Sequence, residues 1–182
     1  MSSSRPIAGP SRRALFLAPL ALALAGCGFH PLYSTRGTRD WDPDLAAINI
    51  LPINDRAGQI LALALRENLN PGDMSVRKRW DLTTGVRVTR TDLGIQRNAT
   101  ATTSEITVYA TFQINEAQSG KIVYSSSSNA VGDFDQVNDA YATQVAADGA
   151  RDRALREVAD EMTLRLAIFV RDQRTKAAAA TR

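Results

Sequence analysis

The chain has very few thiols and imidazoles, and each shortage excludes a class of function. Among its 182 residues there is one cysteine, Cys27, and one histidine, His30. A single thiol forms neither an intramolecular disulfide nor a four-thiolate zinc site, and a Ser-His-Asp or Cys-His apparatus would depend on that lone histidine. No cluster of His, Asp or Glu stands at the spacing of metal ligands. The sequence therefore predicts no catalytic residue, no metal site and no cofactor.

Acidic residues are absent before Cys27, and this absence decides how the net charge of +3 is interpreted. The charges in that segment are Arg5, Arg12 and Arg13, and without them the chain carries 19 basic and 19 acidic residues. A charge-balanced body exerts no long-range attraction on polyanions. Nucleic acid is therefore not an expected partner, and an anionic ligand would need a local group of arginines.

A short apolar run follows these arginines. Residues 14–25 read ALFLAPLALALA, which is shorter than the roughly 20 residues of a membrane-spanning helix and is typical of a secretory signal peptide. The next residues, Leu24-Ala25-Gly26-Cys27, resemble the bacterial lipobox, in which cleavage precedes a cysteine that carries diacylglycerol. We expect a signal peptide over 1–26 and a mature chain that begins at Cys27, with N-acyl and S-diacylglycerol groups on that residue.

Such a modification would anchor the protein in a membrane. One acyl chain binds a bilayer only reversibly, so stable attachment requires two or more. Gly28 follows the cysteine and no Asp stands there, which points to the outer membrane in bacteria that retain Asp-marked lipoproteins at the inner membrane. An ordinary secretory signal with an incidental cysteine is the alternative. Ser11-Arg12-Arg13 leaves the export route open between general secretion and twin-arginine export.

The mature chain divides into a tether, a body and a tail. Residues 27–44 are rich in Gly, Pro, Ser and charge without a sustained period, and we expect a tether that includes Trp41. The folded body is expected over 45–174, and residues 175–182 are expected to be an unfolded tail. No internal repeat is visible.

Hydrophobic periodicity predicts strands and helices within the body. Between residues 106 and 115 apolar and polar residues alternate strictly, and a loop with Gly120 joins this strand to the next as a hairpin. Asn54 and Asp55 are turn and N-cap residues before a helix. The expected strands are 45–53, 82–95, 106–115 and one that begins at 122, and the expected helices are 58–69 and about 139–174. This order favours an α+β fold, a two-layer sandwich with two helices packed on one face of a four-stranded mixed sheet.

Several segments resemble one known family. They are CGFHPLY (27–33), INILPINDRAGQILALALRENLN (48–70), QRNATATTSE (96–105) leading into ITVYATFQINE (106–116), and RDRALREVADEMTLRLAIF (151–169). The chain resembles LptE, the lipopolysaccharide-assembly lipoprotein family of the Gram-negative outer membrane. The resemblance implies a non-enzymatic protein, lipid-anchored on the periplasmic side. Such a protein plugs the lumen of the β-barrel LptD, helps that barrel assemble and contacts lipopolysaccharide on its way to the outer leaflet.

Arginines near the predicted turn are candidates for contact with lipopolysaccharide phosphate. Arginine offers two parallel donors that match a phosphate group. Arg97 matches the Arg-Asn turn of the family, and Arg87 and Arg90 lie on the preceding strand. The plainer interpretation is that these arginines keep a strand and its turn soluble. Some relatives carry a further basic residue near the start of the last helix, where this chain has Gln136, so a two-point basic clamp is not expected.

Other surface residues are candidates for contact with a partner protein. The polar side of the strand 106–115 presents Thr107, Tyr109 and Thr111, which suit a wet interface. Leu164 and Ile168 lie roughly opposite the apolar stripe of the last helix. Plain solvent exposure is the alternative for both sets.

The basic cluster RKRW (77–80) allows two interpretations. Its three positive charges beside Trp80 could bind phosphates or a membrane surface, and more often such a run is a solvated loop or edge strand.

Two other functions remain open from the sequence. The first is another auxiliary outer-membrane lipoprotein, such as a barrel-assembly or transport-complex subunit, that does not bind lipopolysaccharide. The second is an anchored periplasmic hydrolase, but no carboxylate pair can be assigned to a shared cleft.

Overall fold

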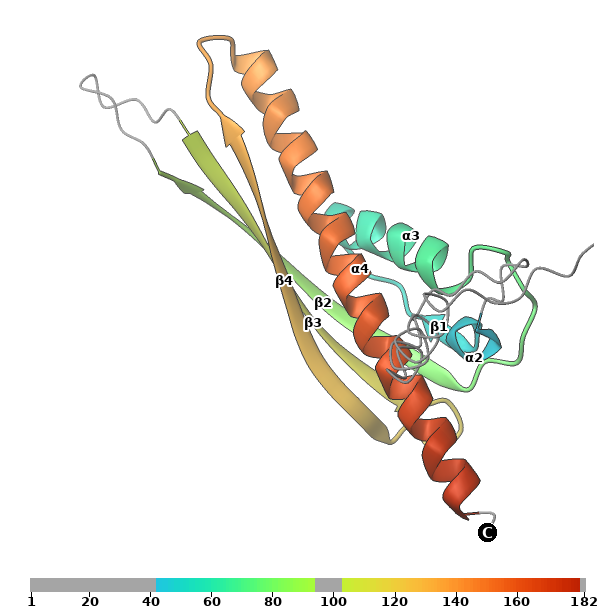
Figure 1. The fold of residues 1–182 in the computed structure, drawn as a ribbon. Coiled ribbons are helices and arrows are strands. Elements are labelled where there is room, and N and C mark those ends of the chain that lie inside the picture. The colour runs from blue at the N-terminus through green and yellow to red at the C-terminus, as the bar shows by residue number, and fades with distance from the viewer. Residues whose placement is uncertain (1–41, 94–102, 181–182) are drawn as a thin grey trace, which may run out of the picture. The chain divides into compact units, whose positions relative to one another are not determined.

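A computed structural model describes residues 42–93 and 103–180 (Figure 1). The predicted signal peptide, Cys27, Trp41 and Arg97 lie outside the described residues. The elements, in chain order, are α2 (Pro43–Ala46), β1 (Ile48–Ile50), α3 (Arg56–Leu69), β2 (Trp80–Asp92), β3 (Thr103–Glu116), β4 (Ile122–Asp135) and α4 (Ala140–Ala180). No helix among these elements is both long enough and apolar enough to span a bilayer.

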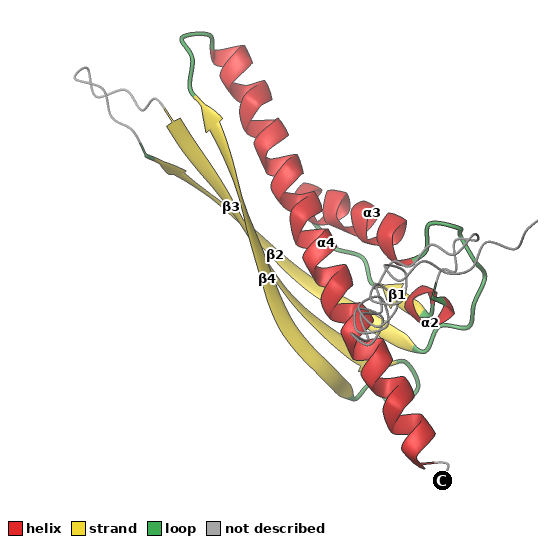
Figure 2. Ribbon diagram, viewed as in Figure 1, coloured by secondary structure: helices red, strands yellow, loops and turns green. Residues whose placement is uncertain are grey.

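The strands form one mixed sheet in the order β1-β2-β3-β4. The short β1 runs parallel to β2, whereas β2, β3 and β4 are antiparallel. Helices α3 and α4 lie together on one side of this sheet (Figure 2). The predicted α+β sandwich with two helices on one face of a four-stranded mixed sheet is confirmed, and the short α2 is an additional helix. We call the face under the helices the inner face and the opposite one the outer face.

The alternation in β3 sets the two faces apart, as predicted. Its inner-face residues are buried: Ile106, Val108, Ala110, Phe112 and Ile114. The hairpin to β4 is confirmed as well, because Gly120 has φ +68 and its N–H donates to the Glu116 carbonyl at 2.8 Å. Glycine reaches that left-handed conformation without the steric cost that a Cβ carries.

The predicted N-cap of α3 is confirmed. The Asp55 carboxylate accepts a hydrogen bond from the Gly58 N–H, so the helix begins at Arg56, two residues before the predicted start. At the other end, Asn70 ends the helix. Its Oδ1 accepts from the Met74 N–H at 2.9 Å, and its Nδ2 donates to the Met74 carbonyl at 3.1 Å.

The first predicted strand is much shorter than expected. Only Ile48–Ile50 is extended in the sheet, although residues 45–53 were expected to be. Pro43–Ala46 instead form α2, which begins inside the predicted tether. The reason is local: the Asp42 carboxylate caps the Asp44 N–H at 2.9 Å, and proline fits the first helical turn because its missing N–H has no partner there.

Helix α4 continues beyond its predicted end. It extends to Ala180, so the expectation of an unfolded tail from 175 is wrong as far as that residue. Alanine has the highest intrinsic helix propensity, and the run 177–180 continues the helix without needing an apolar stripe. The predicted stripe is buried throughout: Leu155, Val158, Ala159, Met162, Leu166, Phe169 and Val170.

An aromatic group joins α4 to three strands of the sheet. The Phe169 ring lies 5.9 Å from the Trp80 ring in an edge-on arrangement and 5.3 Å from the Tyr124 ring. Phe112 lies 6.2 Å from Tyr124. Aromatic pairs in these geometries stabilise a core beyond their buried area.

Candidate functional site

Arg87 and Arg90, two of the predicted phosphate contacts, lie on opposite faces of β2. Successive residues of a strand point to alternate faces, so positions three apart diverge. Arg87 is on the outer face, where its cross-strand neighbour is Tyr109. Arg90 is on the inner face, where its guanidinium lies 4.9 Å from the centre of the buried Phe134 ring. The two arginines therefore cannot act as one group, and Arg97, the third, lies outside the described residues.

Arg90 belongs to a polar cluster at the end of the sheet that borders residues 94–102. Its Nε donates to Asp92 at 3.1 Å and its Nη2 donates to the Ser104 hydroxyl at 3.3 Å. The Ser104 hydroxyl, which is fully buried, donates to the Asp92 carboxylate. This hydrogen bond, followed by the one from Arg90, lowers the pKa of Asp92.

Gln136 completes this cluster from the segment between β4 and α4. Its Nε2 donates to Ser104 at 2.7 Å and to Asp92 at 3.1 Å. The cluster therefore connects the end of β2, the start of β3 and the entry to α4. Sequence reasoning did not bring Ser104 and Gln136 together, because they are 32 positions apart and no spacing pattern links them. The one available signal was that Asp92 and Ser104 flank the predicted turn.

The outer face of the sheet carries a shallow depression of about 670 Å³ around Arg87 and Tyr109. Tyr109 is 49% exposed, and Thr111 is also exposed beside the depression. Gly85, the cross-strand neighbour of Thr111, opens the floor because it has no side chain. This surface has the hydroxyl-rich character that the sequence predicted for the polar side of β3.

Thr107, the third residue predicted on this surface, is only 8% exposed. Its hydroxyl donates to the Glu105 carboxylate at 2.9 Å, on the same strand. A contact with a partner through Thr107 therefore stays a prediction, and the structure leaves much less of its surface available than of Tyr109.

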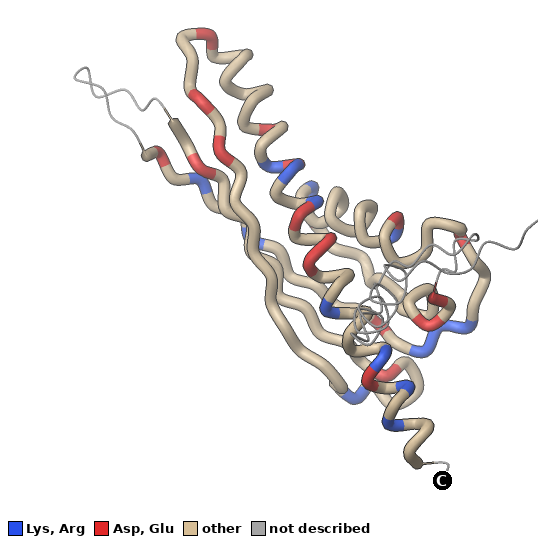
Figure 3. Tube along the Cα trace, in the orientation of Figure 1, with Lys and Arg blue, Asp and Glu red and all other residues tan. Residues whose placement is uncertain are grey.

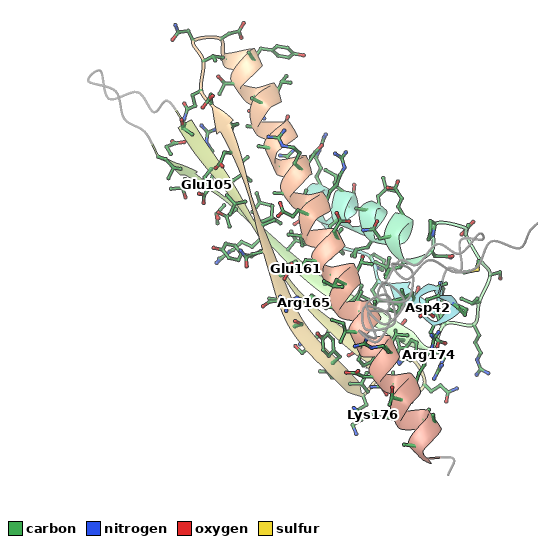
Figure 4. The ribbon with its side chains drawn as sticks, in the orientation of Figure 1. Asp42, Glu105, Glu161, Arg165, Arg174 and Lys176 are labelled. Atoms are coloured by element: carbon green, nitrogen blue, oxygen red, sulfur yellow. The ribbon has the colours of Figure 1, made fainter. Side chains whose placement is uncertain are left out.

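The exposed part of α4 carries both apolar and charged residues. Leu164 and Ile168 are 43% and 41% exposed. Between them Arg165 binds Glu161 one turn earlier, with Nε donating to Oε1 at 3.1 Å, and it also donates to the Ser126 hydroxyl of β4 at 3.0 Å. Figure 4 shows this pair on the side of the helix toward β4. The contact of Arg165 with Ser126 connects this part of α4 to β4.

The basic cluster RKRW is largely engaged with the fold. Lys78 Nζ donates to the Ala46 carbonyl at 2.7 Å, and the Arg79 guanidinium lies 4.5 Å from the centre of the Trp80 ring and 3.4 Å from Asp44. Trp80 is buried. Of the two interpretations from sequence, these contacts favour the structural one.

Charge of each sign is spread over the described part of the chain. Figure 3 shows Lys and Arg interspersed with Asp and Glu along α4 and near β1. Among the described residues there is no group of His, Cys, Asp or Glu that could hold a metal ion. The fold and these surfaces define a two-layer α+β protein that presents a hydroxyl-rich sheet face and a partly apolar helix side.

A family model agrees with this class. The model named LptE, described as lipopolysaccharide-assembly, matches residues 45–166, and the chain therefore belongs to the LptE family. Members of this family are non-enzymatic lipoproteins of the outer membrane that take part in lipopolysaccharide transport and assembly.

Two solved structures share the fold. A lipoprotein from Caulobacter crescentus aligns with a TM-score of 0.58 and 20% identity, over 69% of this chain and 92% of that one. Rare lipoprotein B from Shewanella oneidensis aligns with a TM-score of 0.54 and 12% identity, over 70% of this chain and 96% of that one. Among curated proteins, no match was found.

Proposed function

We propose that the protein is an outer-membrane lipoprotein that plugs an LptD-type barrel and helps deliver lipopolysaccharide to the outer leaflet, without enzymatic activity of its own. The observation that supports this most is the family match, because residues 45–166 cover most of the folded body. The lipobox at Cys27 supplies the anchor on the periplasmic side. The hydroxyl-rich outer face around Tyr109 and the exposed Leu164 and Ile168 of α4 are the proposed contacts with the barrel.

Mass spectrometry of the protein purified from membranes tests the anchor. We expect a mature chain that begins at Cys27 and carries the mass of a diacylglycerol and an N-acyl group. An unmodified thiol or an intact leader would contradict the anchor.

Purification in gentle detergent tests the partner. The proposed function requires that the barrel remains bound to the wild-type protein and that depletion of the protein removes lipopolysaccharide from the cell surface. Recovery without a barrel would favour a different auxiliary lipoprotein.

Binding of lipopolysaccharide to the purified protein tests the arginines. Arg97→Glu is expected to weaken binding strongly, and Arg87→Glu and Arg90→Glu less so, because charge reversal opposes phosphate. Arg171→Glu is the matched control, since this exposed arginine lies on the last part of α4. Equal binding by Arg97→Glu and the control would exclude the phosphate contact.

A further inference from the structure

Within the part of the chain that the structure describes, one edge of the sheet is largely unpaired. Strand β1 pairs with β2 only from Trp80 to Leu82, and the last main-chain bond on that side joins the Leu51 N–H to the Leu82 carbonyl at 3.0 Å. From Thr83 to Asp92, no strand among the described residues pairs with that side of β2. We call this segment the open edge.

Two hydrogen bonds establish which main-chain groups face the open edge. The Leu82 carbonyl points toward β1, whereas the Leu93 N–H donates to the Thr103 carbonyl of β3 at 2.9 Å. Because the N–H and C=O of successive strand residues point to alternate sides, even-numbered residues direct both groups to the free side. The residues concerned are Thr84, Val86, Val88, Arg90 and Asp92.

The opposite edge of the sheet, on β4, is closed by side chains of α4. The Arg153 guanidinium donates to the Asp133 carbonyl at 3.3 Å, and the Glu161 carboxylate accepts from the Asn129 N–H. Proteins commonly cover edge strands because free main-chain groups pair with other chains. Helix α4 covers one edge in this way, and no such contact is made by described residues along the open edge.

The side chains of the open edge favour a different chain over a second copy. Val88 is 37% exposed on the inner face, so an added strand would find apolar contact there. Arg87 is exposed on the outer face and forms no ion pair with a described residue. Pairing of two copies along this edge would bring both Arg87 side chains onto one face, where like charges repel.

We propose that the open edge binds an extended segment of the barrel partner as an added strand, with a carboxylate of that segment beside Arg87. This inference rests on the proposed function, because it assigns the added strand to the barrel. Main-chain hydrogen bonds from the even-numbered residues supply the affinity, and the Arg87 contact selects the acidic segment. The sheet would then continue past the end of β1.

Proline substitution tests the open edge without disturbing the rest of the sheet. Val88→Pro removes an N–H that faces the free side and leaves the ladder to β3 intact. Val88→Ala retains the N–H. Ser127→Pro is a matched control on β4, because position 127 has the same parity as Asn129, whose N–H faces that edge.

Each variant is co-expressed with the barrel, and the amount of barrel that co-purifies is measured after thermal melting has shown that the variant folds. We expect at least a tenfold loss for Val88→Pro and a clear loss for Arg87→Glu. Val88→Ala keeps the N–H and loses only part of the apolar contact, so its loss should be much smaller than that of Val88→Pro, and Ser127→Pro should cause none. Full recovery with Val88→Pro, or equal loss with Ser127→Pro, overturns the inference. If the wild type itself recovers no barrel, the proposed function fails first.

A photocrosslinking residue at position 88 covers the case in which Val88→Pro does not fold. A crosslink to the barrel from position 88 and none from position 127 supports the added strand. A crosslink to a second copy, or none from position 88 while the barrel co-purifies, overturns it.

Discussion

Gly132 of β4 lies directly against Ala150 of α4. A Cβ at position 132 would be 2.4 Å from the Ala150 carbonyl oxygen and 3.0 Å from its carbonyl carbon. Real Cβ atoms do not approach backbone so closely, so the helix can pack on β4 only because residue 132 is glycine. The contact sets the separation of the two layers where β4 crosses α4.

Gly132→Ala is therefore expected to lower the free energy of unfolding by about 1–3 kcal/mol, the usual cost of overpacking. Chemical denaturation measures the change. Gly85→Ala is the control: its Cβ would lie 3.3 Å from the Thr111 hydroxyl, a side chain that can rotate, and we expect a change within about 0.5 kcal/mol. Equal effects at the two positions would contradict the close approach.

Phe169→Ala is expected to destabilise the body by about 3–5 kcal/mol, because the ring is buried against Trp80 and Tyr124. Ile168→Ala, one position away and 41% exposed, should cost less than about 1 kcal/mol. The two losses of stability are measured from the midpoints of denaturant unfolding curves, with the same denaturant slope used for both variants. If Ile168→Ala leaves stability unchanged but reduces barrel recovery, the proposed helix contact gains support. Unchanged recovery would remove Ile168 from the interface.

The stability contributed by Glu161 is expected to depend on pH. The Ser128 hydroxyl, followed by the hydrogen bond from Arg165, lowers the pKa of Glu161. A carboxylate whose pKa is lowered on folding stabilises the protein fully above its unfolded pKa of about 4.3, and that contribution is lost as the pH falls through the folded pKa.

Glu161→Gln should thus destabilise the protein at pH 7 by about 1 kcal/mol or less, since the side chain is 36% exposed and solvent screens the pair. The difference from wild type should shrink as the pH is lowered below about 4.3. Denaturation at both pH values measures it. A difference that stays constant with pH would show that the carboxylate charge does not carry the effect.

Arg174 is expected to hold the last turns of α4 to α2. Its guanidinium binds the carboxylates of Asp44 and Asp42, and the Asp44 hydrogen bond contributes most to raising the pKa of Arg174 (Figure 4). Arg174→Ala should change global stability by less than about 1 kcal/mol, because the site is half exposed. Amide exchange over residues 171–180 should nevertheless become faster, and high salt should reproduce the effect in the wild type. Unchanged exchange would contradict this role.

Much of the fold could be predicted because it depends on neighbouring residues. The two-residue alternation of β3, the stripe of α4 around Met162, the Asp55 cap and the turn at Gly120 each follow from local backbone geometry. The opposite orientation of Arg87 and Arg90 follows from the same alternation. The extension of α4 past 174 was missed because the prediction followed the apolar stripe and gave no weight to alanine propensity.

The candidate site depended on contacts between distant segments. Ser104 belongs to the polar cluster because the folded sheet brings β2, β3 and Gln136 close together. No local sequence pattern predicts that contact. The same is true of the edges: α4 places Arg153 beside β4, whereas β1 ends at Ile50 and no other described strand pairs with that side of β2. The sequence by itself determined the strands, the helices and which of their faces are apolar, because these depend on period. Tertiary structure decided which polar groups meet and which edge of the described sheet has no partner strand, because pairing depends on packing across the whole body.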